Sequence, residues 1–146
     1  MADLDQLLDD FSFLSNWEDR YQYVIELGRE LEPFPDELRT EANKVRGCVS
    51  QVWLSSAMGT DPDGSDDPML FVGDSDAHIV RGLIAILLAI YSEKTPRQIL
   101  QINAKEILTR FGLEEHLTPQ RSNGLYAMVE RIRADASSRI NVPQSV

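Results

Sequence analysis

The chain has 146 residues and a mass of 16.5 kDa, with 42% apolar and 26% charged residues, which is typical of one globular domain with a sizeable core. Its formal net charge of −10 argues against nucleic acid or an anionic membrane as the main partner, because both attract basic surfaces. The longest apolar run, Ile79 to Tyr91, has 13 residues, whereas a membrane-spanning helix needs about 20. With no signal-peptide pattern and a single cysteine, the sequence predicts a soluble, cytoplasmic protein.

Two helices are predicted at the N-terminus. Residues 3–14 place leucines and Phe11 on one face of a short helix. Ser15 followed by Glu18 has the spacing of a capping box and predicts a second helix that runs to about Leu31. Pro33 and Pro35 follow and would end it.

A β-type pattern begins at Lys44. Residues 44–57 are rich in β-branched and aromatic side chains, and a second such run covers 69–72, which predicts two stretches of strand joined by a long hairpin loop. Gly47 and Cys48 interrupt the first stretch, so we expect Cys48 at a break between strands. The acidic loop at 61–67 is similar to a calcium-binding loop, but it lacks two required ligands and is interpreted as a polar loop.

Helices return after Gly73. Ser75 or Asp76 is expected to cap a buried helix over 79–91. Further helices are predicted from Thr95–Pro96, over 105–111 with a stop at Gly112, and from Thr118–Pro119 to about residue 137. The fold class is therefore α+β, a small antiparallel sheet of about three strands packed with N- and C-terminal helices. We expect one domain over 1–146, with its core at 4–136 and a frayed tail at 137–146.

The charge is uneven along the chain. Residues 1–42 carry a net charge of −9 and residues 81–146 a net charge of +3. This asymmetry could orient a partner, or it could reflect ordinary solvated helix faces.

Several chemistries lack support in the sequence. There is no glycine-rich nucleotide-binding loop and no Cys-x-x-Cys pair. Two histidines and one cysteine leave little material for a metal site. Cys48 is the remaining candidate: Gly47 permits a sharp turn, Arg46 could favour the thiolate, and Ser50 and Gln51 offer hydrogen bonds. The alternative is that Cys48 is a small buried apolar residue.

Three segments resemble the SufE family of sulfur-acceptor proteins of iron–sulfur cluster assembly. They are Arg46-Gly47-Cys48-Val49-Ser50-Gln51-Val52-Trp53, Gly73-Asp74-Ser75-Asp76-Ala77-His78 with the residues up to Ala85, and His116-Leu117-Thr118-Pro119-Gln120-Arg121 with the residues up to Leu125. The resemblance covers about residues 4–136. It departs from the family only in the loop 59–68 and in the tail.

The resemblance implies a sheet with helices packed on it, which agrees with the predicted elements. It also implies that Cys48 takes a sulfane sulfur from a pyridoxal-phosphate-dependent cysteine desulfurase, stimulates that enzyme, and passes the sulfur to an iron–sulfur cluster scaffold. No cofactor is expected in this chain, because the pyridoxal phosphate belongs to the desulfurase. The protein would be a carrier with a cysteine persulfide rather than a stand-alone enzyme. A single thiol suits a carrier, because a second one could release the sulfur by forming a disulfide.

The remaining candidates are interpreted as partner-binding residues, each with a structural alternative. They are Arg46, Gly47, Ser50, Gln51, Asp74, Asp76, His78 and Arg121. Asp74 and Asp76 are also helix-cap candidates, and Arg121 either faces the cysteine loop or pairs with one of these carboxylates. His78 and His116 are expected at the surface or in caps rather than as catalytic bases.

Two rival functions remain open. One is a non-catalytic module that regulates a desulfurase, and the other is a cysteine hydrolase that uses His78 or His116 with Cys48. The sequence also leaves open whether the chain forms a homodimer and which desulfurase it meets.

Overall fold

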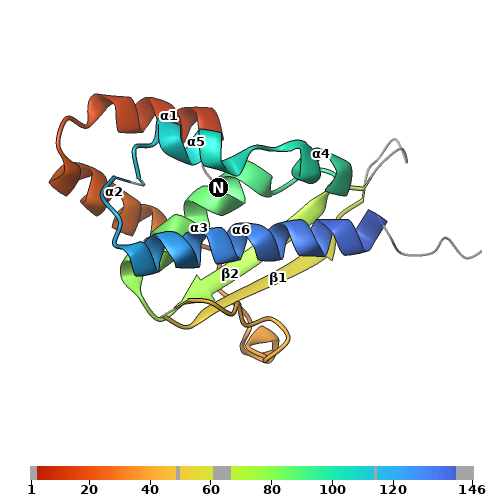
Figure 1. The fold of residues 1–146 in the computed structure, drawn as a ribbon. Coiled ribbons are helices and arrows are strands. Elements are labelled where there is room, and N and C mark those ends of the chain that lie inside the picture. The colour runs from red at the N-terminus through yellow and green to blue at the C-terminus, as the bar shows by residue number, and fades with distance from the viewer. Residues whose placement is uncertain (1–2, 49, 61–66, 114, 141–146) are drawn as a thin grey trace, which may run out of the picture.

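The computed structural model describes residues 3–48, 50–60, 67–113 and 115–140. A two-stranded antiparallel sheet lies below a group of helices, and α6 runs alongside the strands while the η1 segment loops out beneath them (Figure 1). The elements in chain order are α1 (Leu4–Phe13), α2 (Trp17–Arg29), η1 (Asp36–Leu38), β1 (Val52–Met58), β2 (Met69–Ser75), α3 (His78–Tyr91), α4 (Pro96–Gln101), α5 (Ala104–Arg110) and α6 (Pro119–Ile140). The predicted α+β class is confirmed.

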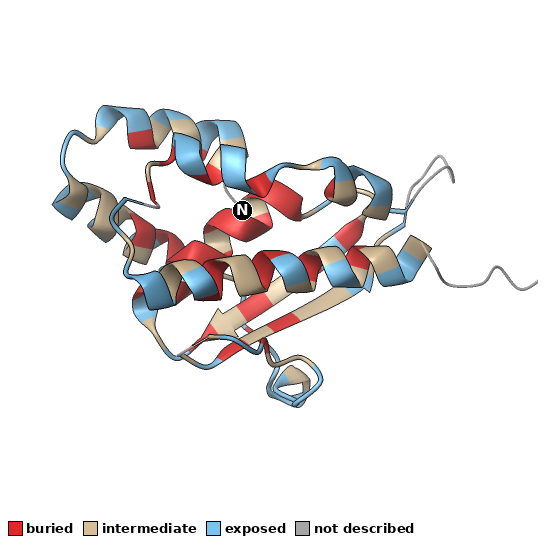
Figure 2. Cartoon of the chain, in the orientation of Figure 1, coloured by how far each residue is buried: buried red, intermediate tan, exposed pale blue. Residues whose placement is uncertain are grey.

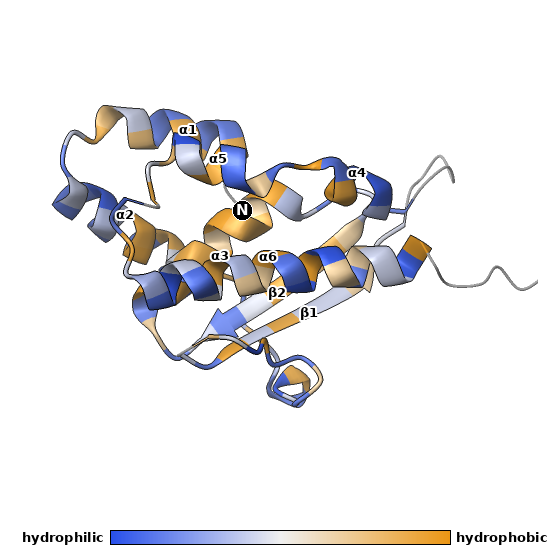
Figure 3. Cartoon of the chain, in the orientation of Figure 1, coloured by the Kyte–Doolittle hydropathy of each residue, from blue (hydrophilic) through white to orange (hydrophobic). Residues whose placement is uncertain are grey.

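Helix α3 forms the centre of the core. Ten of its positions are buried, and it is the reddest element in Figure 2 and the most apolar in Figure 3. These positions are Ile79, Val80, Gly82, Leu83, Ile84, Ile86, Leu87, Leu88, Ile90 and Tyr91. A helix that is apolar on nearly all sides is stable only when other elements cover it, and α2, β2, α1 and α6 do so here.

Helices α2 and α3 cross at two glycines. A β-carbon on Gly28 would lie 2.7 Å from the backbone nitrogen of Gly82, and one on Gly82 would collide with the carbonyl oxygen of Val24. The two backbones can approach this closely only because neither glycine has a side chain.

The sheet has two strands where about three were expected. Val52 pairs with Ser75 at one end of the ladder and Met58 with Met69 at the other. The stretch from Lys44, expected as strand, forms only an isolated bridge to Trp53. The chain turns at Gly47, whose φ is +90°, so residues 43–45 fold back along the free edge of β1 instead of continuing it.

Several element ends differ from the sequence prediction. Helix α2 is capped by Asn16, whose side chain accepts a hydrogen bond from the Asp19 amide, rather than by Ser15. Strand β2 extends through Ser75 and α3 begins at His78 with Ala77 as its N-cap, so neither Ser75 nor Asp76 caps this helix as expected. Residues 137–140, expected to fray, continue α6.

Other boundaries agree with the prediction. Thr95 and Gln98 form the predicted capping box of α4, and Thr118 accepts a hydrogen bond from the Arg121 amide at the start of α6. Gly112 follows α5 with φ of +69°. Loop residues 61–66 and tail residues 141–146 lie outside the described part of the chain. Within that part, no helix combines the length and apolarity needed to cross a bilayer.

Candidate functional site

Cys48 lies in the turn that separates residues 43–45 from β1. The Val45 amide donates to the Val52 carbonyl at 2.8 Å, so the chain returns on itself between these residues. Gly47 takes the left-handed backbone conformation that this turn requires, with φ of +90°, and L-residues with a side chain rarely adopt it. The turn therefore presents Cys48 to a neighbouring element.

That neighbour is helix α6. The Cys48 thiol donates a long hydrogen bond to the Gly124 carbonyl, with 3.6 Å between Sγ and the oxygen. A β-carbon on Gly124 would lie 3.5 Å from Sγ, and one on Gly47 would lie 3.4 Å from the Cβ of Ala127. Small residues on α6 thus let the cysteine turn lie directly on the helix, and the cysteine is half-buried.

A pocket of about 340 Å³ adjoins the thiol. Its polar lining comes from the cysteine turn and from the first turns of α6, and its apolar lining comes from α3 and α6. The lining residues are Cys48, Ser50, Val80, Leu83, Thr118, Gln120, Arg121, Gly124, Leu125 and Met128. A persulfide adds only one sulfur atom to a cysteine, so the pocket has room for it.

Arg121 lines this pocket rather than pairing with Asp74 or Asp76. Among the described residues its guanidinium forms no ion pair, whereas Asp74 lies between Arg39 and Arg81, and Asp76 accepts from the Gln51 amide. The structure therefore places a positive charge on the wall of the Cys48 pocket.

Burial raises the pKa of the Cys48 thiol above its ordinary value, because desolvation disfavours the thiolate. Arg46 was expected to favour the thiolate, but this arginine is exposed and burial is the cause of the shift. The resting thiol is therefore mainly protonated at neutral pH, which lowers its reactivity as a nucleophile.

We predict that iodoacetamide alkylates Cys48 more slowly in the folded protein than in urea, and with a higher pH midpoint. The direction follows from the raised pKa, because the folded state keeps the thiol proton to a higher pH than the unfolded chain does. The contribution of this thiol to stability is therefore fully present below the ordinary cysteine pKa. It is lost as the pH rises through the pKa of the folded state. Alkylation rates between pH 6 and 10 give both midpoints. Equal midpoints in the two states would contradict the sheltered thiol.

The cysteine turn is also tied to the segment before α3. The Gln51 amide donates to Asp76 Oδ1 at 3.0 Å, and the Asp76 amide donates to the Gln51 carbonyl at 3.3 Å. The end of the cysteine turn at Gln51 and the segment around Asp76, which are far apart in the sequence, therefore lie side by side. Ser75 lies under this junction, where its Oγ accepts from the Ala77 amide at 3.2 Å.

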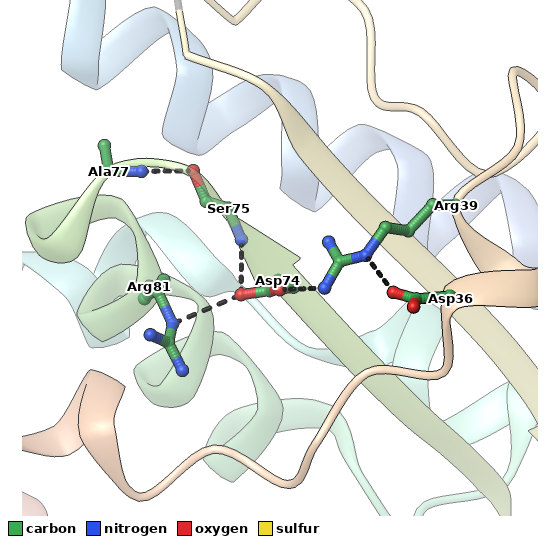
Figure 4. Close-up of polar contacts among 6 residues, drawn as sticks. All are labelled: Asp36, Arg39, Asp74, Ser75, Ala77 and Arg81. Carbon is green, nitrogen blue, oxygen red and sulfur yellow. Dashed lines mark hydrogen bonds and ion pairs between the residues drawn. The ribbon is translucent and has the colours of Figure 1, made fainter.

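Asp74 joins two arginines beneath this junction (Figure 4). Its Oδ2 lies 2.7 Å from Arg39 Nη2, and its Oδ1 lies 3.2 Å from Arg81 Nε, although that nitrogen makes no directed hydrogen bond within the described residues. The Arg39 guanidinium also lies 5.0 Å from the ring centre of Trp53. Arg39 could not be identified from the sequence, because it stands 35 positions from Asp74 and belongs to no local motif.

The two histidines make other contacts or face the solvent. His78 is the exposed first residue of α3, and His116 is stacked on Trp17 with ring centres 4.3 Å apart. Neither one lines the pocket that contains Cys48. No group of three or more potential metal-ligating side chains gathers within the described ranges.

Known proteins are similar to this chain in sequence over nearly its whole length. The family profile SufE, described as an Fe-S metabolism associated domain, matches residues 5–136. An uncharacterized SufE-like protein of Rhizobium meliloti is 53% identical over 96% of this chain and 99% of its own length. A second uncharacterized SufE-like protein, from Rhizobium etli, is 56% identical over 95% of this chain and 93% of its own.

A solved structure supports the fold alone. The solution structure of a hypothetical protein from Thermus thermophilus superposes with a TM-score of 0.71, at 22% identity, over 94% of this chain and 95% of that one. The match to the family profile and the identity to the two rhizobial proteins extend over nearly the whole chain, with the cysteine turn and both of its neighbouring segments inside the matched range. This protein is a member of the SufE family, whose domain is associated with iron–sulfur metabolism.

Proposed function

We propose that this protein accepts sulfur from a cysteine desulfurase onto Cys48 and delivers it to an iron–sulfur cluster scaffold. The observation that carries the proposal is the placement of the only thiol of the chain, on a glycine turn beside a pocket of about 340 Å³. Membership of a family associated with iron–sulfur metabolism supports it. The pyridoxal phosphate of such a reaction belongs to the desulfurase, and both proteins would meet in the cytoplasm.

The transfer is a thiol–persulfide exchange without net oxidation. The Cys48 thiolate attacks the terminal sulfur of the desulfurase persulfide, a new sulfur–sulfur bond forms on Cys48, and the old one breaks. The desulfurase cysteine leaves as a thiolate and takes up the proton that Cys48 has lost. Delivery to the scaffold repeats the exchange with this protein as the donor.

The half-buried position of the thiol implies that the cycle has two states, a resting one and a reactive one. In the resting state Cys48 is half-buried against Gly124 and has a raised pKa. Reaction requires the two sulfur atoms to meet within bonding distance, so the turn has to leave α6 when the desulfurase binds. The desulfurase would drive this change by binding the released turn more tightly than the resting one. In the released turn the thiol is no longer buried, so it again ionises to the thiolate.

The resting state also protects the protein. An exposed persulfide loses its sulfur to small thiols, and an exposed thiolate is oxidised. A half-buried cysteine beside a pocket limits both reactions, and Arg121, which lines the same pocket, offers a positive charge to the anionic persulfide.

The test of the proposal is sulfur loading measured by intact mass. After incubation with a desulfurase and cysteine, the protein should gain one sulfur, about 32 Da, which dithiothreitol removes. The Cys48→Ser variant should gain nothing and should no longer stimulate the desulfurase. A variant that still gains the sulfur would overturn the assignment of Cys48.

The same variant separates the proposal from its rivals. A purely regulatory module would keep its effect on the desulfurase in Cys48→Ser. A cysteine hydrolase would release a burst of product from a chromogenic ester, but neither histidine lines the pocket with Cys48, so we expect no burst.

We expect the desulfurase to dock on residues 46–51 and 74–78. The Gln51–Asp76 pair holds these segments together, and the first of them carries the reacting thiol. Hydrogen exchange with and without the desulfurase should show protection there. Protection confined to α1 and the last turns of α6 would contradict this docking surface.

A further inference from the structure

A second groove lies on the other side of β2 from the cysteine site. Its volume is about 630 Å³, nearly twice that of the Cys48 pocket, and it shares no lining residue with that pocket. Its walls come from both strands, from the C-terminal end of α2 and from the second half of α3, with one residue each from α1 and η1. The proposed sulfur transfer makes no use of it.

The groove follows a free strand edge. At this edge Met69 pairs with the segment that follows α3. Its amide donates to the Lys94 carbonyl and its carbonyl accepts from the Glu93 amide, both at 2.8 Å. Alternate residues of a strand direct their amides and carbonyls to the same edge, so Phe71 and Gly73 direct theirs to this edge as well. Within the described ranges, no backbone partner pairs with them there, and both residues line the groove.

Apolar side chains continue the groove beside this edge. Leu31, Leu38, Leu70 and Val72 line it. Leu70 is 42% exposed and is one of two large apolar residues that the described part of the chain leaves exposed. A peptide strand added to the edge would cover Leu70 and satisfy the unpaired backbone groups at the same time.

All charged residues that line the groove are acidic. Glu30, Glu32 and Glu93 line the groove, all three residues are exposed, and no lysine, arginine or histidine lines it. Glu93 also has a φ of +65°, a backbone conformation that favours glycine. The hydrogen bond from its amide to the Met69 carbonyl holds it at the end of the free edge. The complementary occupant is therefore a positively charged one.

We propose that this groove binds an extended segment of a partner protein in which apolar side chains alternate with lysine or arginine, by adding it as a third strand to the β2 edge. Backbone pairing with Phe71 and Gly73 would set its register, Leu70 and Val72 would receive its apolar side chains, and the three glutamates would select for basic ones. The surface is separate from the cysteine turn, so a partner held here leaves Cys48 free to exchange sulfur.

The test uses a fluorescent synthetic peptide, acetyl-Lys-Val-Lys-Leu-Lys-Val-Lys-amide, and the full-length protein. Anisotropy should show binding that weakens with salt, and amide exchange should slow at Phe71 and Gly73. The triple variant Glu30→Gln, Glu32→Gln, Glu93→Gln should bind about tenfold more weakly, since an exposed ion pair contributes roughly a 1.4- to fivefold factor, or about twofold for each of the three. The matched control Glu106→Gln, Glu115→Gln, Glu130→Gln changes the net charge equally at exposed sites outside the groove and should bind nearly as well as the wild type.

Peptide controls test the strand pairing itself. A peptide with glutamate in place of every lysine should not bind. Two further peptides carry N-methyl groups on alternate residues, one on the odd positions and the other on the even positions. At least one of these two should lose binding. The proposal would be overturned if the lysine peptide did not bind, or if both triple variants lost affinity equally. It would also be overturned if the peptide slowed amide exchange only outside β2. Self-association of the protein through this groove would also overturn it, because the occupant would then be a second copy. Sulfur loading of Cys48 is measured on the same variants, so failure here is distinguishable from failure of the carrier assignment.

Discussion

Replacing Gly82 with alanine should lower the free energy of unfolding by at least about 2 kcal/mol, although alanine is the better helix former by about 1 kcal/mol. The added methyl group would lie 2.7 Å from the carbonyl carbon of Val24 and closer still to its oxygen, so α2 and α3 have to separate. Over-packing of this kind typically costs about 1–3 kcal/mol and occasionally more, and here the neighbours are backbone atoms that no side-chain rotation can move.

The matched control is Gly124→Ala, at another glycine inside a helix. Its methyl group would lie 3.5 Å from the nearest atom, Cys48 Sγ, which is an ordinary contact. We expect this variant to be as stable as the wild type or slightly more so, because it gains helix propensity. Urea denaturation measures both free energies, and the melting temperature of Gly82→Ala should fall by about 6–10 °C for a chain of this size. Equal stability of Gly82→Ala and wild type would show that the helices can separate at little cost.

The Gly124→Val variant should make Cys48 react with iodoacetamide about tenfold faster than in the wild type. The three atoms nearest to a β-carbon at Gly124 all belong to Cys48, so a branched side chain has to displace the cysteine turn. An over-packing penalty of about 1–3 kcal/mol would then favour the released turn, which has a lower thiol pKa and better access.

The control for this variant is Asn123→Val, because Asn123 is the neighbouring residue on α6 and is exposed. It brings the same side chain to the same helix turn without touching Cys48, so alkylation should stay at the wild-type rate. If Gly124→Val reacts no faster, the contact with Gly124 does not shelter the thiol. If both variants react equally fast, the cause is a general loosening of α6 rather than the contact with Cys48.

The sequence predicted the helices well because their signals are local. The capping box at Thr95, the stop at Gly112 and the apolar surface of α3 each lie within a few residues of the structure they specify. The strand from Lys44 was overextended for the opposite reason. Residue composition favours β structure on both sides of Gly47, and only the pairing of residues 43–45 with β1 shows that the chain turns back there.

The candidate site divides in the same way. Cys48 and its glycine could be identified from the sequence, because one motif contains both. The distance from Arg121 to Asp74 or Asp76 could not be derived from helix periodicity, so its position in the Cys48 pocket needed the tertiary structure. The effect of Arg46 was predicted wrongly, because burial acts on the thiol and burial depends on helix α6.

The contact between Cys48 and helix α6 has a consequence for the order of folding. The carbonyl that accepts from its thiol belongs to a residue 76 positions later in the chain. Contacts between such distant segments close late, since the loop between them must first be ordered. A ribosome-bound or partly folded chain in which α6 has not yet docked therefore carries a fully reactive cysteine. The rate at which that cysteine loses reactivity during refolding reports the arrival of the last helix, and the same side chain that is proposed to carry sulfur serves as a natural probe of the final step of its own folding.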